Sequence, residues 1–373
     1  MKIVFSENIN EIPAAQWDAL AGDSNPFIAH DFLCALEQFD CLQNWGWLPQ
    51  HCLLYDNGSL IGACPAYIKD NSYGEFVFDW AWADAYQRNQ RDYYPKLVTA
   101  IPFTPATGPR LLTKSNHAGA SPGAIKQGLI KALISHASLR QLSSVHFLFC
   151  EQSDINCLAE QQLLQRYDYQ YHWQNHHYSD FDDFLSRLTS RRRKNIKRER
   201  RKVQQENIRI EWIAGAELSE EQWQTLYNFY RLTFMKKSGA ATLTLDFFKA
   251  MAGKLRAIFA YHEGRTVAGA ICFEGADTLY GRHWGCIDNY DSLHFEVCYY
   301  TGIDYCIRQG LKFFEPGAQG EHKIWRGFLP VKTRSAHWIA EPVFRAAIAD
   351  FLQRESRAMH EHGKLLMQSS PYK

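Results

Sequence analysis

Side chains able to do acid–base chemistry gather near the C-terminus, where residues 313–323 read Phe-Phe-Glu-Pro-Gly-Ala-Gln-Gly-Glu-His-Lys. Within nine residues this run offers acids, a base and an anion-binding group, namely Glu315, Glu321, His322 and Lys323. Gly317 and Gly320, on either side of Gln319, free backbone amides because glycine lets the main chain approach a ligand closely. Apolar strand-like segments bracket the run, which favours a functional loop over a merely polar connection.

A second group of candidates precedes this loop. Residues 280–286 end a strand-like segment with Arg282 and His283, where open α/β sheets usually bind their substrates. A helical pattern then opens with His294 and Glu296. Glu296 either contacts a ligand or compensates the positive end of its helix, because both roles suit an acid in the first turn.

The strongest charge feature is an amphipathic helix predicted over residues 181–203, with a thin apolar stripe and basic remaining faces. Within 187–202, ten Lys and Arg residues face Glu199 alone. Like charges four residues apart repel, so we expect the run to bind an anion, with a solvated charged face as the alternative. The expected contacts are Arg192, Arg193, Lys194 and Arg198. No aromatic residue lies between 185 and 211, so the run itself offers bases no stacking platform.

The net charge of +1 conceals this feature. Residues 1–186 carry 11 basic and 20 acidic side chains, a net of −9, whereas residues 187–373 carry 30 and 20, a net of +10. The segment 187–202 holds ten bases and one acid, and therefore +9 of that excess. Such asymmetry points to an anionic partner or substrate.

An aromatic segment with two carboxylates, residues 78–84, stands out in the first half of the chain. Trp80 and Trp82 would share one side of a strand, directly after Asp79. We expect these side chains either to form the wall of a cleft or to belong to the core.

Several chemistries are disfavoured. The phosphate-binding, dinucleotide-binding and hydrolase patterns G-x-x-x-x-G-K-[ST], G-x-G-x-x-G and G-x-S-x-G do not occur. His172, His176 and His177 lack cysteine and carboxylate partners at ligand spacing, so we expect no metal site.

The sequence predicts a cytoplasmic protein. No apolar run approaches the 18 or so residues that a membrane span needs. The N-terminus reaches Glu7 before a secretory apolar core can form. The ten cysteines form no C-x-x-C pair, several of them lie in apolar runs, and they are interpreted as buried, reduced thiols.

The order of elements predicts an α/β (α+β) protein with two similar domains. Two helices, a hairpin, a strand, a helix and a strand recur in each half, as pattern rather than as residue identity. The expected domains are residues 1–178 and residues 179–373, the second of which begins with the basic helix. The elements expected in the two halves are helices at 13–20, 31–39, 123–139, 220–234, 245–254, 293–309 and 343–361, and strands at 52–55, 60–68, 145–150, 257–261, 267–273, 278–283, 311–315 and 336–339.

These residues resemble the FemAB-like family of N-acyltransferases, which is related to peptidoglycan-bridge aminoacyltransferases. The resemblance covers nearly the whole chain. It is carried by residues 78–84, 102–109, 192–203 and 293–330, the last of which includes Glu315–Lys323 and Arg326-Gly327-Phe328. Arg193-Lys194-Asn195-Ile196 matches the Arg-x-Asn-Ile helix of the bridge enzymes, and Lys323 with Gly327-Phe328 matches their Lys-x-x-x-Gly-Phe pattern.

The resemblance implies two tandem GNAT-like domains and transfer of an acyl or aminoacyl group to an amine acceptor. The donor is expected to be an acyl-CoA or an aminoacyl-tRNA, with no tightly bound cofactor. Glu315 or Glu321 is expected to act as base, with His283 as an alternative, while Lys323 and Arg282 stabilise negative charge. The rival hypothesis is a non-catalytic RNA- or anion-binding protein with a degenerate acyltransferase fold.

Overall fold

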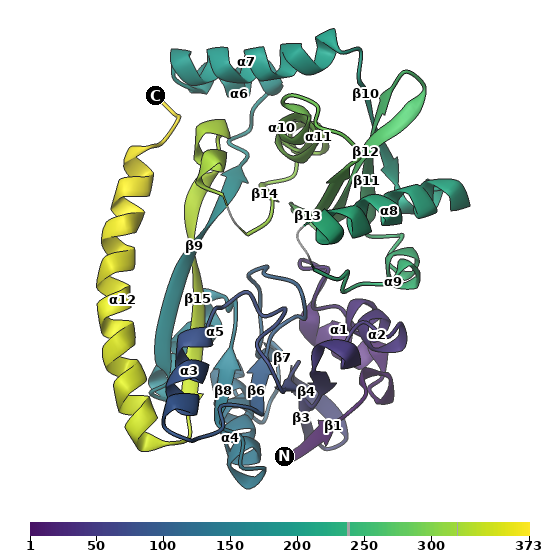
Figure 1. Ribbon diagram of the computed structural model, residues 1–373. Coiled ribbons are helices and arrows are strands. Elements are labelled where there is room, and N and C mark those ends of the chain that lie inside the picture. Colours follow the sequence, from purple (N-terminus) through teal and green to yellow (C-terminus); the bar gives the residue numbers. More distant parts are fainter. Residues whose placement is uncertain (237–238, 319) are drawn as a thin grey trace. The chain divides into compact units, whose positions relative to one another are not determined.

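The structure is a computed structural model that describes residues 1–236, 239–318 and 320–373. Contacts divide the chain into two compact units (Figure 1). The first comprises Met1–Asp168 and Lys332–Glu361, and the second Tyr169–Val331 and His362–Lys373. The chain passes between them within β9 (Leu164–Gln174), β15 (Leu329–Ile339) and α12 (Pro342–Gln368). No periodicity in the sequence signals that residues 332–361 pack with the first segment.

The first unit contains two sheets. One has the order β1-β3-β4-β7 and the other the order β15-β8-β6-β5-β2. Helix α4 packs on β3, β4 and β8. Two residues fix where it begins. The Ser121 Oγ accepts a hydrogen bond from the Ala124 amide, and Pro122 occupies the first helical position. The elements are α1 (Ala14–Ala21), α2 (His30–Gln38), α3 (Trp80–Arg88), α4 (Pro122–Leu139), α5 (Gln152–Glu160), β1 (Lys2–Ser6), β2 (Trp47–Pro49), β3 (His51–Asp56), β4 (Ser59–Cys64), β5 (Tyr67–Lys69), β6 (Lys96–Thr99), β7 (Leu112–Thr113) and β8 (Ser144–Phe147).

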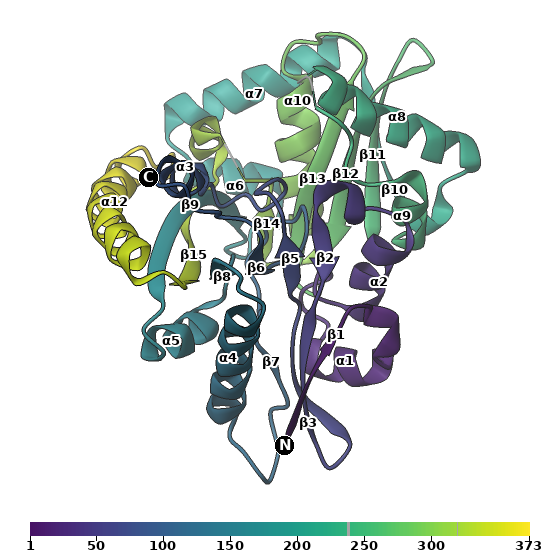
Figure 2. The ribbon, with the colours of Figure 1, turned by 60° about the horizontal axis from the view of Figure 1, so that its bottom comes forward.

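The second unit has one sheet, in the order β10-β11-β12-β13-β14-β9. Helix α8 packs on β12 and β13, so closely that a Cβ atom at Gly285 would lie 2.0 Å from the Phe229 carbonyl oxygen. Helix α11 also packs on the sheet, and Figure 2 shows α8 and α10 on either side of β11–β13. The elements are α6 (Phe181–Arg187), α7 (Ser190–Gln205), α8 (Glu220–Lys236), α9 (Leu245–Ala250), α10 (Leu293–Phe295), α11 (Thr301–Gln309), β10 (Arg209–Ala214), β11 (Leu255–His262), β12 (Arg265–Glu274), β13 (Thr278–Cys286) and β14 (Phe313–Glu315).

The recurring pattern read from the sequence is present in three dimensions. Each unit has an antiparallel hairpin followed by a pair of parallel strands that a helix connects. In the first unit β6 and β8 run parallel, with Val98 opposite His146. In the second unit β13 and β14 run parallel, with Tyr280 opposite Glu315. The expected repeat of α/β units is therefore confirmed.

Two predicted elements are interrupted. The helix expected over 181–203 is two helices, α6 and α7. The break lies at Leu188, which is fully buried in an extended conformation. The next amide, that of Thr189, donates a hydrogen bond to the Pro371 carbonyl oxygen at 2.8 Å. The strand expected over 60–68 divides into β4 and β5, which belong to different sheets, at Pro65, a residue without an amide hydrogen. Local pattern cannot reveal such tertiary effects.

No helix in the described ranges combines the length and the apolar character that crossing a membrane requires.

Candidate active site

The candidate site of the second unit lies where its two parallel strands part. β13 and β14 pair only over Thr278–Tyr280 and Phe313–Glu315. β14 ends at Glu315, whereas β13 continues beside β12 as far as Cys286. The loop after β14 passes so close that a Cβ atom at Gly281 would lie 3.3 Å from Pro316 Cα. The strands therefore open at Glu315, at the carboxyl end of a parallel pair, where open α/β sheets usually bind their ligands.

Two glycines of this loop adopt left-handed backbone conformations. Gly317 and Gly320 have φ angles of 95° and 112°, which side-chain-bearing residues rarely adopt. The Gly317 carbonyl oxygen accepts a hydrogen bond from Lys323 Nζ at 2.7 Å. Gln319, also predicted to take part, lies outside the described residues. The loop thus turns back on itself and brings Lys323 to the end of β14.

A β-bulge places Arg282 at the opening. Cys272 of β12 pairs with Gly281 and Ile271 pairs with His283, so Arg282 is the extra residue. Bulges redirect side chains and are frequent next to active sites. Burial lowers the pKa of Arg282 to about 10, against the opposing effect of Glu315, so the guanidinium still carries its charge at neutral pH.

Glu315 lies beside a histidine from β9. His172 Nδ1 is 3.7 Å from Glu315 Oε1, and the two side chains are only 12% and 17% exposed. Burial raises the pKa of Glu315 to about 8, although Arg282 opposes this effect. Burial and the charge of Lys323 lower the pKa of His172 to about 4. At neutral pH this corner therefore holds a mostly protonated carboxyl group and a neutral imidazole.

Lys323 is the buried cation of the site. It lies in a 3-10 helix, Glu321–Arg326, and is 3% exposed. Burial lowers its pKa to about 8. Next to it, His322 Nε2 is 2.9 Å from the Tyr299 hydroxyl group. A lysine and a carboxyl group that both titrate near pH 8 in one partly enclosed place are typical of catalytic sites rather than of surface loops.

The other two proposed bases lie elsewhere in the second unit. His283 points toward α8 and α9, where the rings of Tyr230, Phe234 and Phe248 surround it at centroid distances of 4.5, 6.4 and 5.9 Å. Burial lowers its pKa to about 3, so it stays neutral. Glu321 has a 64% exposed side chain, 3.6 Å from His362. Of the three, Glu315 is the one that lies at the strand opening.

Several predicted ligand contacts have internal partners instead. Arg326 holds Glu199 through two hydrogen bonds, of 2.8 and 3.2 Å, and the Tyr300 hydroxyl group donates to the same carboxylate. Arg200 holds Glu296, at 3.0 Å, in a π-helical turn, Glu296–Tyr300. These contacts join α7 to the π-helical turn and to the 3-10 helix Glu321–Arg326 that carries Lys323.

His294 likewise lies in packed surroundings, 5.4 Å from the ring of Trp284 and 5.3 Å from that of Tyr299. The structure thus gives Arg326, Glu296 and His294 supporting positions around the loop.

Helix α7 keeps a row of cations on its outer face. Some of its basic residues are held internally: Lys197 pairs with Asp182 at 3.1 Å, Lys202 pairs with Asp291 at 2.5 Å, and Arg193 donates to the Leu188 carbonyl oxygen at 3.4 Å. Four exposed cations, at spacings of three, four and three residues, form no ion pair within 4.0 Å among the described residues: Arg191, Lys194, Arg198 and Arg201. This spacing sets them along one helix face, which is here called the basic stripe.

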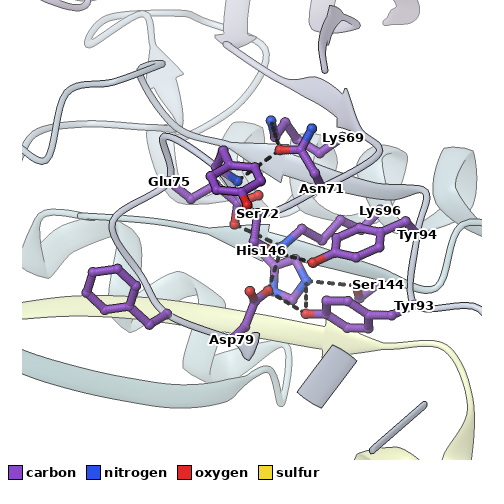
Figure 3. Close-up of polar contacts among 12 residues, drawn as sticks. Lys69, Asn71, Ser72, Glu75, Asp79, Tyr93, Tyr94, Lys96, Ser144 and His146 are labelled. Carbon is purple, nitrogen blue, oxygen red and sulfur yellow. Dashed lines mark hydrogen bonds and ion pairs between the residues drawn. The ribbon is translucent and has the colours of Figure 1, made fainter. Parts of the chain in front are cut away.

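The expectation for residues 79–82 is wrong in its secondary structure. Trp80 begins α3, so Trp80 and Trp82 do not share one side: Trp82 is 3% exposed in the core and Trp80 is 41% exposed. Asp79 is buried, and its Oδ2 lies 2.5 Å from Lys96 Nζ, which also contacts Glu75 at 2.9 Å (Figure 3). The two-residue spacing of Trp80 and Trp82 suits a strand, but the segment is a helix whose Trp82 and Tyr86 pack into a core cluster with Tyr93.

This buried cluster extends to a histidine pair. The Tyr93 hydroxyl group donates to Asp79 Oδ2 at 2.6 Å and lies 3.2 Å from His146 Nε2 (Figure 3). His146 Nδ1 is in turn 2.7 Å from His337 Nδ1. Asp79 therefore serves an internal network of the first unit.

Sequence reasoning missed His172, Glu75 and Lys96. His172 was considered only as a metal ligand, and no group of His, Cys, Asp and Glu able to hold a metal ion occurs among the described residues. The sequence feature that could have identified His172 is the alternation of side chains along β9. Tyr171 and Trp173 are buried on one side of the strand, and His172 between them points to the other side. Glu75 and Lys96 are 21 residues apart in the chain, and no spacing rule links them.

Comparisons with known proteins agree with this architecture. A family model, FemAB-like, described as peptidoglycan biosynthesis/recognition, matches residues 8–373. No curated protein matches the chain by sequence. Among solved structures, FemX is similar over 94% of this chain and 100% of its own, with a TM-score of 0.53 and 9% identity. The C-terminal domain of a proposed lysylphosphatidylglycerol synthetase from Agrobacterium fabrum covers 90% of this chain and 95% of its own, with a TM-score of 0.55 and 7% identity.

A tandem GNAT protein from the clavulanic acid biosynthesis pathway matches 91% of this chain and 98% of its own, with a TM-score of 0.49 and 10% identity. The expected α/β (α+β) fold is confirmed, with sheets flanked by helices in each unit and a likeness to FemX over nearly the whole chain. With a family model that spans almost every residue, the chain belongs to the FemAB-like family.

Proposed function

We propose that the protein is an N-acyltransferase that moves an acyl or aminoacyl group from an activated donor, an acyl thioester or an aminoacyl-tRNA, to an amine acceptor. One observation carries this proposal. Glu315, His172, Arg282 and Lys323 converge at the opening between β13 and β14, in a chain of the FemAB-like family. Structural likeness at 9% identity supports the fold, while these side chains support the chemistry.

The reaction requires a base, an oxyanion partner and a proton source. The acceptor nitrogen attacks the carbonyl carbon of the donor and loses a proton to the Glu315 carboxylate, directly or through water. Arg282 and Lys323 stabilise the negative charge that develops on the carbonyl oxygen. As the carbon–sulfur or carbon–oxygen bond breaks, Lys323 donates a proton to the leaving thiol or ribose hydroxyl group.

The pH dependence of catalysis follows from the two groups that titrate near pH 8. Glu315 acts when deprotonated, so activity rises as the pH approaches 8, whereas Lys323 acts when protonated, so activity falls above that pH. We expect a bell-shaped profile of kcat/KM with its maximum near pH 8 and a slope of about tenfold per pH unit between pH 6 and 7. In Glu315→Gln the rising limb should vanish, because the titrating acid is gone. A wild-type profile that is flat from pH 6 to 8 would exclude Glu315 as the base.

The basic stripe supports the alternative function, a non-catalytic protein that binds RNA or another anion. The decisive comparison is the shift in melting temperature on adding a CoA thioester, a charged tRNA or an uncharged tRNA. Stabilisation by CoA thioester or charged tRNA above that by uncharged tRNA supports the transferase. Equal stabilisation by both tRNAs, together with indifference to Lys323→Ala, supports the alternative.

The basic stripe makes a quantitative prediction for polyanions. Replacing Arg191, Lys194, Arg198 and Arg201 by glutamine should weaken RNA binding at every sequence and flatten its salt dependence. Each lost phosphate contact lowers the slope of log K against log salt by about 0.7 for a single strand. The measurement is fluorescence anisotropy from 50 to 300 mM salt. As a matched control, removing Arg354, an exposed arginine of α12, should leave the slope unchanged.

A further inference from the structure

The single acid of the basic segment does not compensate its own helix. Glu199 is the only Asp or Glu within 187–202. An acid on a helix compensates bases three or four positions away, and among those positions Lys202 alone is basic. Lys202 pairs with Asp291 instead, at 2.5 Å. The Glu199 carboxylate therefore serves a partner outside α7.

That partner is a nearly buried arginine. Two hydrogen bonds, of 2.8 and 3.2 Å, join the Arg326 guanidinium to the two oxygens of the Glu199 carboxylate. The Tyr300 hydroxyl group donates to the same carboxylate. The side chains of Glu199 and Arg326 are 17% and 9% exposed. Because guanidinium and carboxylate groups are both planar, a pair held at two points fixes orientation as well as distance.

The pair ends in the short helix that carries the lysine of the proposed site. Arg326 follows Lys323 by three residues in the 3-10 helix Glu321–Arg326. Side chains three residues apart in a 3-10 helix project from the same side, and those of Lys323 and Arg326 are both buried. The Arg326 Nη1 also donates to the His322 carbonyl oxygen at 2.9 Å. A continuous link therefore runs from Glu199 through Arg326 to Lys323.

The ends of this helix do little to hold it in place. Gly320 and Gly327 flank it, with φ angles of 112° and 99°. Glycine gives the backbone more freedom than any other residue does, so the position of the segment depends on its side-chain contacts. Ile324 packs into the core, but apolar contacts have no preferred direction. The ion pair with Glu199 is directional, and it fixes the side of the helix from which Lys323 projects.

We infer that Glu199 is a positioning residue of the proposed active site, which acts through Arg326 to hold Lys323 at the end of β14. The inference rests on the proposed function for the part that Lys323 plays in acyl transfer. Glu199 itself transfers no proton in this role. The one acid among ten bases thus orders the catalytic loop, while the bases of the outer face of α7 remain turned away from it.

The first test is the variant Glu199→Gln, which keeps the size of the side chain and removes its charge. We expect kcat to fall about tenfold to a hundredfold, because Lys323 is still present but displaced, and a displacement of about 1 Å can lower a rate about a hundredfold. KM for donor and acceptor should stay within about twofold, since Lys323 acts in the transition state. Steady-state kinetics measure both constants. A wild-type kcat in folded Glu199→Gln overturns the inference.

The second unit offers a matched control. Glu274 pairs with Arg256 at 2.9 Å and accepts a hydrogen bond from the Tyr305 hydroxyl group at 2.6 Å, so it has the same two kinds of partner as Glu199. Its members belong to β11, β12 and α11, and not to the helix that carries Lys323. Glu274→Gln should therefore lose a comparable ion pair and keep kcat within about twofold. An equal fall of kcat in both variants would contradict a specific role for Glu199.

A double variant separates positioning from stability. Glu199→Gln leaves Arg326 nearly buried without its carboxylate, and an unpaired buried charge destabilises a fold by itself. Combining Glu199→Gln with Arg326→Met removes that charge, so the melting temperature should return toward the wild-type value while kcat stays low. If kcat recovers together with the melting temperature, Glu199 only stabilises the protein and the inference is wrong.

Hydrogen exchange tests the same link without any substrate. The amides of Lys323, Gly327 and Phe328 donate to backbone carbonyl oxygens of this segment. Amides of residues 320–328 should exchange about tenfold faster in Glu199→Gln than in the wild type, because a looser segment opens more often, and at the wild-type rate in Glu274→Gln. Unchanged exchange in Glu199→Gln would show that the ion pair does not hold the segment.

The two proposals can therefore fail separately. If exchange rises in Glu199→Gln but the wild-type protein transfers no acyl group from any donor, the link to the Lys323 segment stands and the transferase does not. If transfer depends on Lys323 but Glu199→Gln keeps the wild-type kcat and exchange rates, the transferase stands and the positioning role does not.

Discussion

Replacing Lys323 by alanine is expected to lower turnover at least about a hundredfold while leaving the protein folded. The expected size is that of removing one preorganised partner of a developing oxyanion. Lys323 is 3% exposed, and among the described residues its Nζ donates only to the Gly317 carbonyl oxygen and, by the proposed mechanism, to the reacting groups. Because burial lowers its pKa to about 8, enclosing the ammonium group costs free energy that the variant no longer pays.

Single-turnover kinetics with a chosen donor measure this effect, and circular dichroism checks the fold. Lys312→Ala is the matched control, because Lys312 lies in the same unit with a 69% exposed side chain that pairs with Asp277 at 3.4 Å. Turnover within threefold of the wild type in Lys323→Ala would remove Lys323 from the mechanism. A loss in both variants would point to general damage.

Replacing Lys96 by methionine is expected to lower the free energy of unfolding by about 3–5 kcal/mol, the usual cost of leaving a buried charge unpaired. The Lys96 side chain is fully buried, and Glu75 and Asp79 beside it are 1% and 2% exposed. Burial raises the pKa of Glu75 to about 7. Burial also acts to raise the pKa of Asp79, but Lys96 and His146 outweigh it and hold that pKa at about 2.

The loss of unfolding free energy in Lys96→Met should depend on pH in a defined direction. Without Lys96, both carboxyl groups become harder to ionise in the folded state, so their folded pKa values rise above the unfolded ones. Stability then falls as the pH rises through that interval, and the loss should be smaller at pH 5 than at pH 8. Urea unfolding at the two pH values measures it.

The companion variant Lys96→Met with Glu75→Gln and Asp79→Asn should recover part of the loss, because the amides carry no charge. A loss below 1 kcal/mol in Lys96→Met at pH 8 would show that the cluster is hydrated rather than closed.

The sequence predicts most of the fold because its signals are local. The strands expected at 52–55 and 145–150 depend on neighbouring residues, and β3 and β8 form there. Residues 181–203 show the limit of such signals. An uninterrupted helical pattern is broken at Leu188 by contacts with residues 371 and 372, at the other end of the chain.

The site is predictable only in part, for the same reason. Glu315, Lys323 and the two glycines between them share one loop, so their spacing in sequence already places them together. His172 reaches Glu315 from β9, and Arg282 is directed by a bulge that depends on pairing with β12. For Trp80 the local spacing predicts the wrong secondary structure. Its apparent alternation with Trp82 suits a strand, whereas both belong to a helix that buries one ring and exposes the other.

The route of the chain has a consequence for how the protein can be divided. It moves between the two units in β9, in β15 and again in α12, so no single break in the polypeptide separates two complete units. A fragment that ends at residue 331 lacks the strand that pairs with β8, since Ala336–Ile339 lie beyond it. A fragment that starts at 179 lacks the β9 residues that pair with β14. The two units therefore cannot be produced as two complete fragments by cutting the chain at one position.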